Sequence, residues 1–350
     1  MHEKDVLDTS LHCNILRYMK ISWMPLMMIL ATSACSYKGV NSFPLDPVYP
    51  RYISLLDDLN AISNTDPKLA KHRIIGFTDT EHLPLYAVEL GYGKRNVLII
   101  GQHHADEVLG LAVALYLAKS LTEGYSKEKR IKQLLDEYKL WIVPTINPEG
   151  WRLVSSGLTK VKRKNNRDTD GNGKLDLRTD GVDLNRNYPV FWDQDTEVNH
   201  MSSYYKGSDP SSEDEVKAII SLSRKIPFEL AIFYHSSITG ALNERIFLPA
   251  VAEESSSYLK LQELAEFYAA KVPRDYYRGT YTVHRGSSSR VGNARNFFYH
   301  SQNAAAMLIE VGGVNRWGQS ITHPSQNMVE RINKRHFKAF MALLKYMSAG

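Results

Sequence analysis

The hydrophobic residues of this chain are grouped in short, nearly continuous apolar runs, separated by segments with helical spacing. Four of these runs are predicted to be strands, at residues 96–100, 140–147, 230–235 and 304–311. A strand covered on one face alternates apolar and polar residues, whereas a strand buried on both faces is apolar throughout. The runs therefore predict a sheet that is covered on both faces.

Helical patterns lie between and after these runs. Residues 212–225 open with Ser212 and, three residues later, Glu215, the pattern of a helix capping box. A second helix is predicted at residues 256–271. In the C-terminal region, residues at steps of three and four predict a helix with one buried face: Val329, Ile332, His336, Phe340, Leu343 and Met347. Strands alternating with helices predict one α/β domain at residues 49–350.

The N-terminal region has a different pattern. From Met19 to Cys35, one lysine is followed by an uncharged apolar run that ends in small residues, as in a secretory signal. We expect residues 1–35 to be a signal segment that starts at Met19, and residues 36–48 to be a short tether. A buried N-terminal helix is the alternative.

Cys35 resembles the lipidated cysteine of a bacterial lipoprotein, although Thr32 stands where a branched aliphatic residue is usual. We expect a secreted or periplasmic protein; an outer-membrane lipoprotein anchored through Cys35 and a secreted protein without an anchor are the two alternatives. Signal removal would take away Cys13, the other of the two cysteines, so no intrachain disulfide is expected.

Composition and charge exclude few classes of protein. The chain is 43% hydrophobic and 23% charged, as is ordinary for a globular protein. A net charge of +5 is mild, and no segment interleaves basic and aromatic residues. A nucleic-acid partner is therefore not expected.

Candidate metal ligands follow the first predicted strand. His104 and Glu107 are three residues apart directly after it, and His235 ends another strand. Nitrogen and oxygen ligands without a thiolate favour zinc in a catalytic role. Glu310 also ends an apolar run, where a buried carboxylate would be costly without a task.

A pair of polar residues completes the candidate site. Asn185 and Arg186 stand side by side in the run Asp-Leu-Asn-Arg-Asn at residues 183–187. A planar guanidinium beside an amide suits the binding of a carboxylate.

Together these motifs resemble the zinc carboxypeptidase family, whose pattern is His-x-x-Glu, then Asn-Arg, then a distant His and a Glu near the C-terminus. The resemblance covers about residues 49–345. It implies a single α/β domain with a mixed, mostly parallel, twisted sheet and helices on both faces. It also implies hydrolysis of a C-terminal peptide bond and one zinc ion per chain.

The resemblance implies a role for each matching residue. His104, Glu107 and His235 would hold the zinc ion, and Glu310 would be the general base. Arg163 would stabilise the oxyanion, and Asn185 with Arg186 would bind the terminal carboxylate of the substrate. A tyrosine of the family closes over the substrate; Tyr281 is the candidate, with Tyr276 and Tyr277 as alternatives, because its spacing to Gly286 departs from the family pattern by one residue.

Three further residues bear on the kind of substrate that we expect: Asp106, Arg285 and Arg290. Asp106, beside Glu107, resembles the bacterial branch that acts on peptidoglycan stem peptides. Arg290 or Arg285, in the region of the specificity pocket, would favour an acidic group such as the extra carboxylate of diaminopimelate. The alternative is that both arginines are solvated loop residues.

A calcium-like loop precedes the Asn-Arg pair. Its candidate ligands are Asp168, Asp170, Asn172 and Asp176, with Gly173 at the sixth position. Thr179 stands where such a loop carries a glutamate, so a surface turn is the alternative. If calcium binds, it would stiffen the segment between Arg163 and Arg186.

Two other functions remain open from the sequence. One is a zinc-dependent acyl-amino-acid deacylase, which shares the His-x-x-Glu and the distant His. The other is a calcium-stabilised envelope binding protein without activity.

Overall fold

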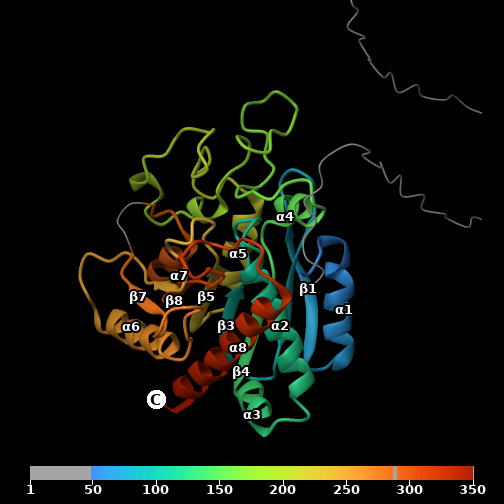
Figure 1. Ribbon diagram of the computed structural model, residues 1–350, viewed down its shortest axis with the longest axis vertical. Coiled ribbons are helices and arrows are strands. Elements are labelled where there is room, and N and C mark those ends of the chain that lie inside the picture. Colours follow the sequence, from blue (N-terminus) through green and yellow to red (C-terminus); the bar gives the residue numbers. More distant parts are fainter. Residues whose placement is uncertain (1–48, 287–289, 350) are drawn as a thin grey trace, which may run out of the picture. The chain divides into compact units, whose positions relative to one another are not determined.

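The computed structural model describes residues 49–286 and 290–349, and these residues form an eight-stranded sheet with helices packed on it (Figure 1). The expected signal segment (1–35) and tether (36–48), with Cys35, lie outside the described residues. Within residues 49–349, apart from 287–289, no helix is both long and apolar enough to cross a membrane.

The elements follow one another along the chain with strands and helices interspersed. The strands are β1 (Ala70–Phe77), β2 (Pro84–Leu90), β3 (Arg95–Ile100), β4 (Tyr138–Val143), β5 (Leu230–His235), β6 (Arg245–Phe247), β7 (Thr282–His284) and β8 (Ala305–Glu310). The helices are α1 (Leu55–Thr65), α2 (Val108–Gly124), α3 (Lys129–Glu137), α4 (Pro148–Ser155), α5 (Asp214–Lys225), α6 (Ser256–Ala269), α7 (Ala294–Gln302) and α8 (Gln326–Ala349). Short 3-10 helices are η1 (Tyr52–Ser54), η2 (Leu184–Arg186) and η3 (Trp192–Gln194).

The sheet has the order β1-β2-β4-β3-β5-β8-β6-β7. Its four central strands, β4, β3, β5 and β8, are parallel to one another. At one edge β2 and β1 continue the sheet in antiparallel pairing; at the other, β6 joins β8 antiparallel and β7 pairs with β6 in parallel. This is the predicted mixed, mostly parallel sheet, and the central strands bring their carboxyl ends to one edge.

Both faces of the central strands are buried. In β3, Val97 and Ile99 belong to one hydrophobic core, and Leu98 and Ile100 belong to a second core on the opposite face. Helices α1, α2, α3, α6 and α8 contribute to the first core, and α5 and α7 contribute to the second. The alternation explains why the strands appear in the sequence as continuous apolar runs, and the prediction of helices on both faces is confirmed.

The predicted central strands correspond to β3, β4, β5 and β8. The run at 140–147 is a strand only as far as Val143, because the chain then turns and α4 begins at Pro148. Asn147 caps α4, since its side chain accepts a hydrogen bond from the backbone N–H of Gly150 at 3.1 Å. The edge strand β1 was not predicted, because most of its residues are partly or fully exposed and form no apolar run.

The capping box predicted at Ser212 is not formed. Helix α5 begins at Asp214, and no side chain caps its first turn. The Ser212 hydroxyl instead accepts a hydrogen bond from Asn187 at 2.9 Å, and Glu215 is buried and accepts one from Asn165 at 3.3 Å. Ser212 and Glu215 therefore form hydrogen bonds with residues distant in the sequence instead of capping the helix. The C-terminal prediction is confirmed, because all six residues of the expected stripe on α8 are buried.

The buried carboxyl of Glu215 predicts a pH-dependent contribution to stability. Burial, and then the charge of Glu213, raise the pKa of Glu215 well above its ordinary value. In the unfolded chain Glu215 ionises at its ordinary pKa. The free energy of unfolding is therefore highest at low pH and falls as the pH rises above that ordinary value. Glu215→Gln removes this loss. We expect the variant to exceed the wild type in free energy of unfolding by about 1 kcal/mol or more at pH 8, and by less at pH 5.

Urea unfolding at the two pH values measures this difference. Glu266→Gln, at an exposed position of α6, is the matched control and should show the same difference at both. An equal effect of Glu215→Gln at pH 5 and pH 8 would mean that Glu215 is ionised in the folded protein.

Candidate metal centre

The candidate site residues meet at the carboxyl ends of the central strands. His104 and Glu107 lie in the loop between β3 and α2, and His235 is the last residue of β5. Glu310 is the last residue of β8, and the strand register pairs it with His235. Residues far apart in the sequence are neighbours here because parallel strands end at the same edge.

Two glycines allow the loop that carries His104 and Glu107 to lie against the neighbouring strand. A Cβ on Gly110, in the first turn of α2, would lie 2.1 Å from the carbonyl oxygen of Gly101 and 3.0 Å from that of Tyr234. The first turn of α2 thus packs directly on the ends of β3 and β5. This close packing brings Glu107 to His235.

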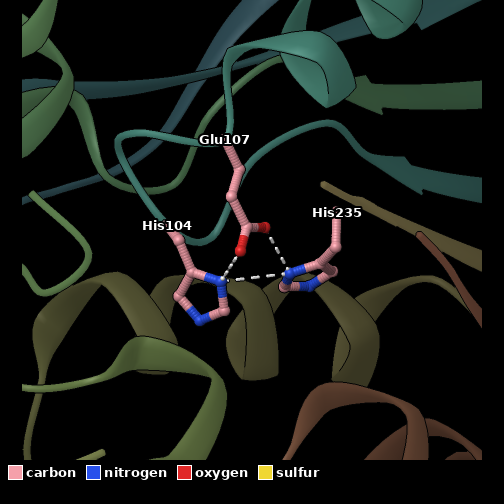
Figure 2. A group of neighbouring side chains, drawn as sticks. All are labelled: His104, Glu107 and His235. Carbon is pink, nitrogen blue, oxygen red and sulfur yellow. Dashed lines mark hydrogen bonds and ion pairs between the residues drawn. The ribbon is translucent and has the colours of Figure 1, made fainter. Parts of the chain in front are cut away.

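The side chains of His104, Glu107 and His235 point toward one another (Figure 2). The Glu107 carboxylate lies between the imidazoles, with Oε1 2.9 Å from His104 Nδ1 and Oε2 2.8 Å from His235 Nδ1. The two Nδ1 atoms are 3.1 Å apart, all three residues are buried, and one ligand atom of each lies within 4.8 Å of the others. Two imidazole nitrogens and one carboxylate that converge in this way fit a zinc ion.

Asp183 orients the first of these histidines. Its fully buried carboxylate has Oδ1 3.0 Å from His104 Nε2, and the same oxygen accepts the backbone N–H of Asn185 at 3.0 Å. Because His104 donates from Nε2 to this carboxylate, its Nδ1 lone pair is directed at the centre, as in other metal-binding histidines. Asp183 was not among the predicted site residues. The available signal was an aspartate two residues before Asn185 in the same polar run.

Arg163 reaches the same centre from a different segment. Its backbone carbonyl accepts hydrogen bonds from Ala105 N–H at 3.4 Å and from the Asn147 side chain at 3.2 Å. Its guanidinium donates from Nε to Asp183 at 2.9 Å, and Nη1 lies 3.5 Å from Glu107 Oε1. A fixed positive charge therefore stands beside the candidate metal ligands, where the sequence analysis expected the oxyanion arginine.

Asn185 and Arg186 form the next part of the site. Asn185 Nδ2 is 3.4 Å from His235 Nε2, and its Oδ1 accepts the Ala294 N–H at 3.0 Å. Arg186 donates from Nη1 to the carbonyl of Asn185 at 2.7 Å, and no described residue accepts from its buried Nε. Among the described carboxylates, none lies within 4.0 Å of the Arg186 guanidinium. The pair thus presents a positive group without a carboxylate partner beside His235.

Glu310 has the environment of a proton-transferring carboxyl. It is 8% exposed, and its Oε2 has no hydrogen-bond partner among the described residues. Burial, and then the negative charge of Glu107, raise the pKa of Glu310 to about 8. A carboxyl whose pKa is near neutrality is suited to general acid–base chemistry.

Comparison with known proteins identifies the family. The sequence pattern of the zinc carboxypeptidases matches residues 55–339. The chain belongs to the zinc carboxypeptidase family. A metallocarboxypeptidase A from Trichophyton tonsurans is 29% identical over 202 residues, which are 56% of this chain and 46% of that protein. An inactive metallocarboxypeptidase from Paracoccidioides brasiliensis is 26% identical over 284 residues, 73% of this chain and 46% of that protein.

These curated relatives are longer proteins, and the chain spans less than half of their length. Solved structures show the same fold at low identity. Bovine thrombin-activatable fibrinolysis inhibitor, in complex with a tick carboxypeptidase inhibitor, matches with a TM-score of 0.71 at 20% identity, over 86% of this chain and 98% of that one. A metallo-carboxypeptidase from Burkholderia cenocepacia matches with a TM-score of 0.58 at 16% identity, over 83% and 68%.

The zinc carboxypeptidase tyrosine that closes over the substrate was expected at Tyr281. The structure buries Tyr281, whose hydroxyl accepts the Gly312 N–H at 2.7 Å and lies 3.3 Å from His336 Nε2. Tyr281 therefore supports the segment that follows Glu310. The alternatives Tyr276 and Tyr277 are about half exposed, and the Tyr277 hydroxyl donates to the carbonyl of Arg316 at 2.9 Å.

Tyr204 is the tyrosine that the structure brings to the arginines of the site. Its ring lies beneath three guanidinium groups, with ring-centroid distances of 5.1 Å to Arg163, 5.8 Å to Arg186 and 4.3 Å to Arg290. An aromatic face attracts such cations and holds them close in spite of their repulsion. The sequence contains no motif that marks Tyr204, which lies in the long segment between α4 and α5 that gathers at one end of the sheet in Figure 1.

The arginines expected to bind an acidic substrate group already have carboxylate partners. Arg290 Nη1 lies 3.9 Å from Asp195 Oδ1 and 3.8 Å from Glu197 Oε2. Arg285 is paired with Glu254. Neither guanidinium contacts the metal ligands among the described residues.

The predicted calcium loop has a different arrangement from the one expected. One carboxylate oxygen each of Asp168, Asp170 and Asp180 lies within 4.8 Å of the others. Asp180 was not among the predicted ligands, and the predicted ligand Asp176 is not part of this group. The Asp168 carboxylate accepts backbone N–H groups of its own turn, from Gly171 at 2.8 Å and Gly173 at 2.7 Å. Asp176 accepts from Arg178 and Thr179 in the same way, and Asn172 Nδ2 donates to Asp170 at 2.8 Å. These are the hydrogen bonds of Asx turns, and the structure gives no support to calcium binding.

The contact between Asp183 and His104 is expected to strengthen zinc binding at the centre. Asp183→Asn keeps the size of the side chain and removes the charge that holds His104 in its orientation. We expect zinc affinity to fall by about 10- to 100-fold, as measured by competition with a chromophoric chelator. Asp180→Asn is the control, because Asp180 is buried in the same segment but bonds to Thr169 and Asp176. An unchanged zinc affinity in Asp183→Asn would contradict the role of Asp183.

Proposed function

We propose that this chain is a zinc-dependent metallocarboxypeptidase that hydrolyses the C-terminal peptide bond of its substrate. The observation that carries the proposal is the convergence of His104, Glu107 and His235 with a buried Glu310 on the adjacent strand end. The buried carboxyl of Glu310, whose pKa is raised to about 8, is suited to proton transfer. A protein that only binds its ligand has no need of such a group.

The proposed reaction assigns one task to each group. Asn185 and Arg186 bind the terminal carboxylate and so place the last peptide bond between the metal ligands and Glu310. Glu310 accepts a proton from the water whose oxygen adds to the scissile carbonyl carbon. Arg163 stabilises the negative charge that develops on the carbonyl oxygen.

The tetrahedral intermediate then collapses. Glu310 returns the proton to the leaving nitrogen, the C–N bond breaks, and the products are a shortened peptide and a free amino acid. A zinc ion held by His104, Glu107 and His235 would supply Lewis-acid polarisation of the scissile carbonyl.

We propose peptidoglycan stem peptides as the natural substrates and a secreted or periplasmic location, with a lipid anchor at Cys35. Support comes from the secretory pattern at residues 19–35 and from Asp106 beside Glu107. Mass spectrometry of muropeptides before and after incubation with the zinc-loaded protein tests the substrate. Faster cleavage of ordinary peptides ending in Phe or Arg would contradict it.

Glu310→Gln tests the reaction itself. The amide keeps the shape of the side chain but accepts no proton, so we expect turnover to fall by about 100-fold or more while zinc is retained. Peptide hydrolysis and metal content by atomic emission are measured together. Glu229→Gln is the matched control, because Glu229 is exposed at the opposite end of the sheet, before β5.

The outcome also separates the other two functions. Comparable activity of Glu310→Gln would refute the assignment of the base. Zinc binding by the wild type without turnover of any peptide would favour an inactive binding protein, and preferential cleavage of N-acyl amino acids would favour a deacylase.

A further inference from the structure

The exposed face of α8 carries an excess of positive charge. The helix contains five basic residues and one acidic residue, Glu330. One basic residue, Arg335, is buried and paired with Asp275. The other four are exposed, and steps of three, four and seven residues place them along one side of the helix: Arg331, Lys334, Lys338 and Lys345.

Two of these lysines have no partner of opposite charge. Among the described residues, no carboxylate lies within 4.0 Å of the ammonium of Lys338 or Lys345, whereas Lys334 Nζ lies 3.9 Å from Glu330 Oε2. On α3, Arg130 is exposed and also has no carboxylate within that distance among the described residues. Unbalanced charges of one sign in one region attract anions to it.

A groove of about 870 Å³ lies between α8 and α3 beside these cations. Apolar and basic side chains line it together: Tyr116, Leu134, Phe337 and Met341 with Lys338 and Lys345. The rings of Tyr116 and Phe337 meet edge to face, with centroids 6.0 Å apart. Phe337 and Met341 are only partly buried, so apolar surface remains open among the charges.

This surface lies at the opposite end of the sheet from the metal centre. Arg95 begins β3, and its Nη2 donates to the carbonyl of Met347 near the end of α8 at 3.1 Å. Tyr138 begins β4, and its hydroxyl donates to the carbonyl of Leu344 at 3.2 Å. The candidate metal ligands lie at the carboxyl ends of β3 and β5, and a strand of six residues spans about 20 Å. A partner that binds the end of α8 would therefore leave the metal centre open.

We propose that the exposed face of α8 and the groove beside it bind the surface of a membrane that contains anionic phospholipids. Lipid phosphates contact Lys338 and Lys345, and the partly exposed Phe337 and Met341 reach the boundary of the acyl chains. The metal centre then faces away from the membrane. This binding goes beyond the proposed peptidase function and does not depend on it.

Three features favour a membrane over a soluble polyanion. Apolar side chains among the cations gain from contact with acyl chains. The unpaired cations of α8 are lysines, whose ammonium groups are point charges without the bidentate geometry of arginine. The described chain also begins beside this helix: the Tyr49 hydroxyl donates at 3.1 Å to the carbonyl of Pro324, two residues before α8. The segment for which we propose a lipid anchor therefore joins the molecule next to α8.

Co-sedimentation of the full chain with lipid vesicles tests this proposal. One set of vesicles is phosphatidylcholine alone, and the other contains an equal part of phosphatidylglycerol. The measured quantity is the ratio of the two partition coefficients, so binding to neutral lipid through any other segment cancels. We expect a ratio of about ten or more for the wild type at low salt, falling as salt is added.

Charge reversal locates the binding surface. Each basic residue near an anionic membrane increases binding by about five-fold, so Lys338→Glu with Lys345→Glu should lower the ratio at least about ten-fold. Lys68→Glu with Lys174→Glu is the matched control, because both lysines are exposed in loops outside this surface and the net charge changes equally. A wild-type ratio near 1, or an equal loss in the control, would overturn the proposal.

Met341→Gln distinguishes a membrane from a soluble acidic partner. The variant keeps every charge and removes apolar contact, so we expect binding to the anionic vesicles to weaken by about three- to ten-fold. Binding of polyglutamate should not change. Unaltered vesicle binding by Met341→Gln would mean that only charge is recognised, which favours a soluble acidic partner and contradicts the membrane proposal. Thermal unfolding of each variant checks that α8 remains folded.

Discussion

The buried carboxylate of Asp183 connects three parts of the candidate site. One of its oxygens contacts His104 Nε2 and the N–H of Asn185, and the other accepts from Arg163. A single fully buried charge thereby orients a candidate metal ligand, the expected oxyanion arginine and the first residue of the proposed substrate clamp. The arrangement is stable because three donors offset the cost of burying that charge.

Three arginines of the site lie close to one another around one aromatic ring. Arg163, Arg186 and Arg290 gather around the ring of Tyr204. Asp183 pairs with Arg163, and Asp195 with Glu197 faces Arg290. The Arg186 guanidinium has no carboxylate within 4.0 Å among the described residues.

Elements with a local sequence signal were predicted correctly, whereas side chains whose partners are distant in the sequence were not. The apolar runs predicted β3, β5 and β8 closely, because burial on both faces leaves a continuous run. The capping box failed because Ser212 and Glu215 bond to distant residues, Asn187 and Asn165. The loop at 168–176 has aspartates at suitable spacing, but their carboxylates accept backbone N–H groups of the loop itself.

The sequence by itself determined the fold class, the family resemblance and the three residues that lie together at the candidate metal centre, because these depend on apolar periodicity and on the order of the motifs along the chain. Only the tertiary structure decided which polar residues are partners. Arg290 was expected to bind an acidic group of the substrate, yet it faces the carboxylates of Asp195 and Glu197. Tyr281, expected to close over the substrate, is buried against Gly312, whereas Tyr204, which no motif marks, lies against the site arginines. Pairing and burial depend on how α7, β6 and the segment before α5 pack, and residue spacing carries no information about that packing.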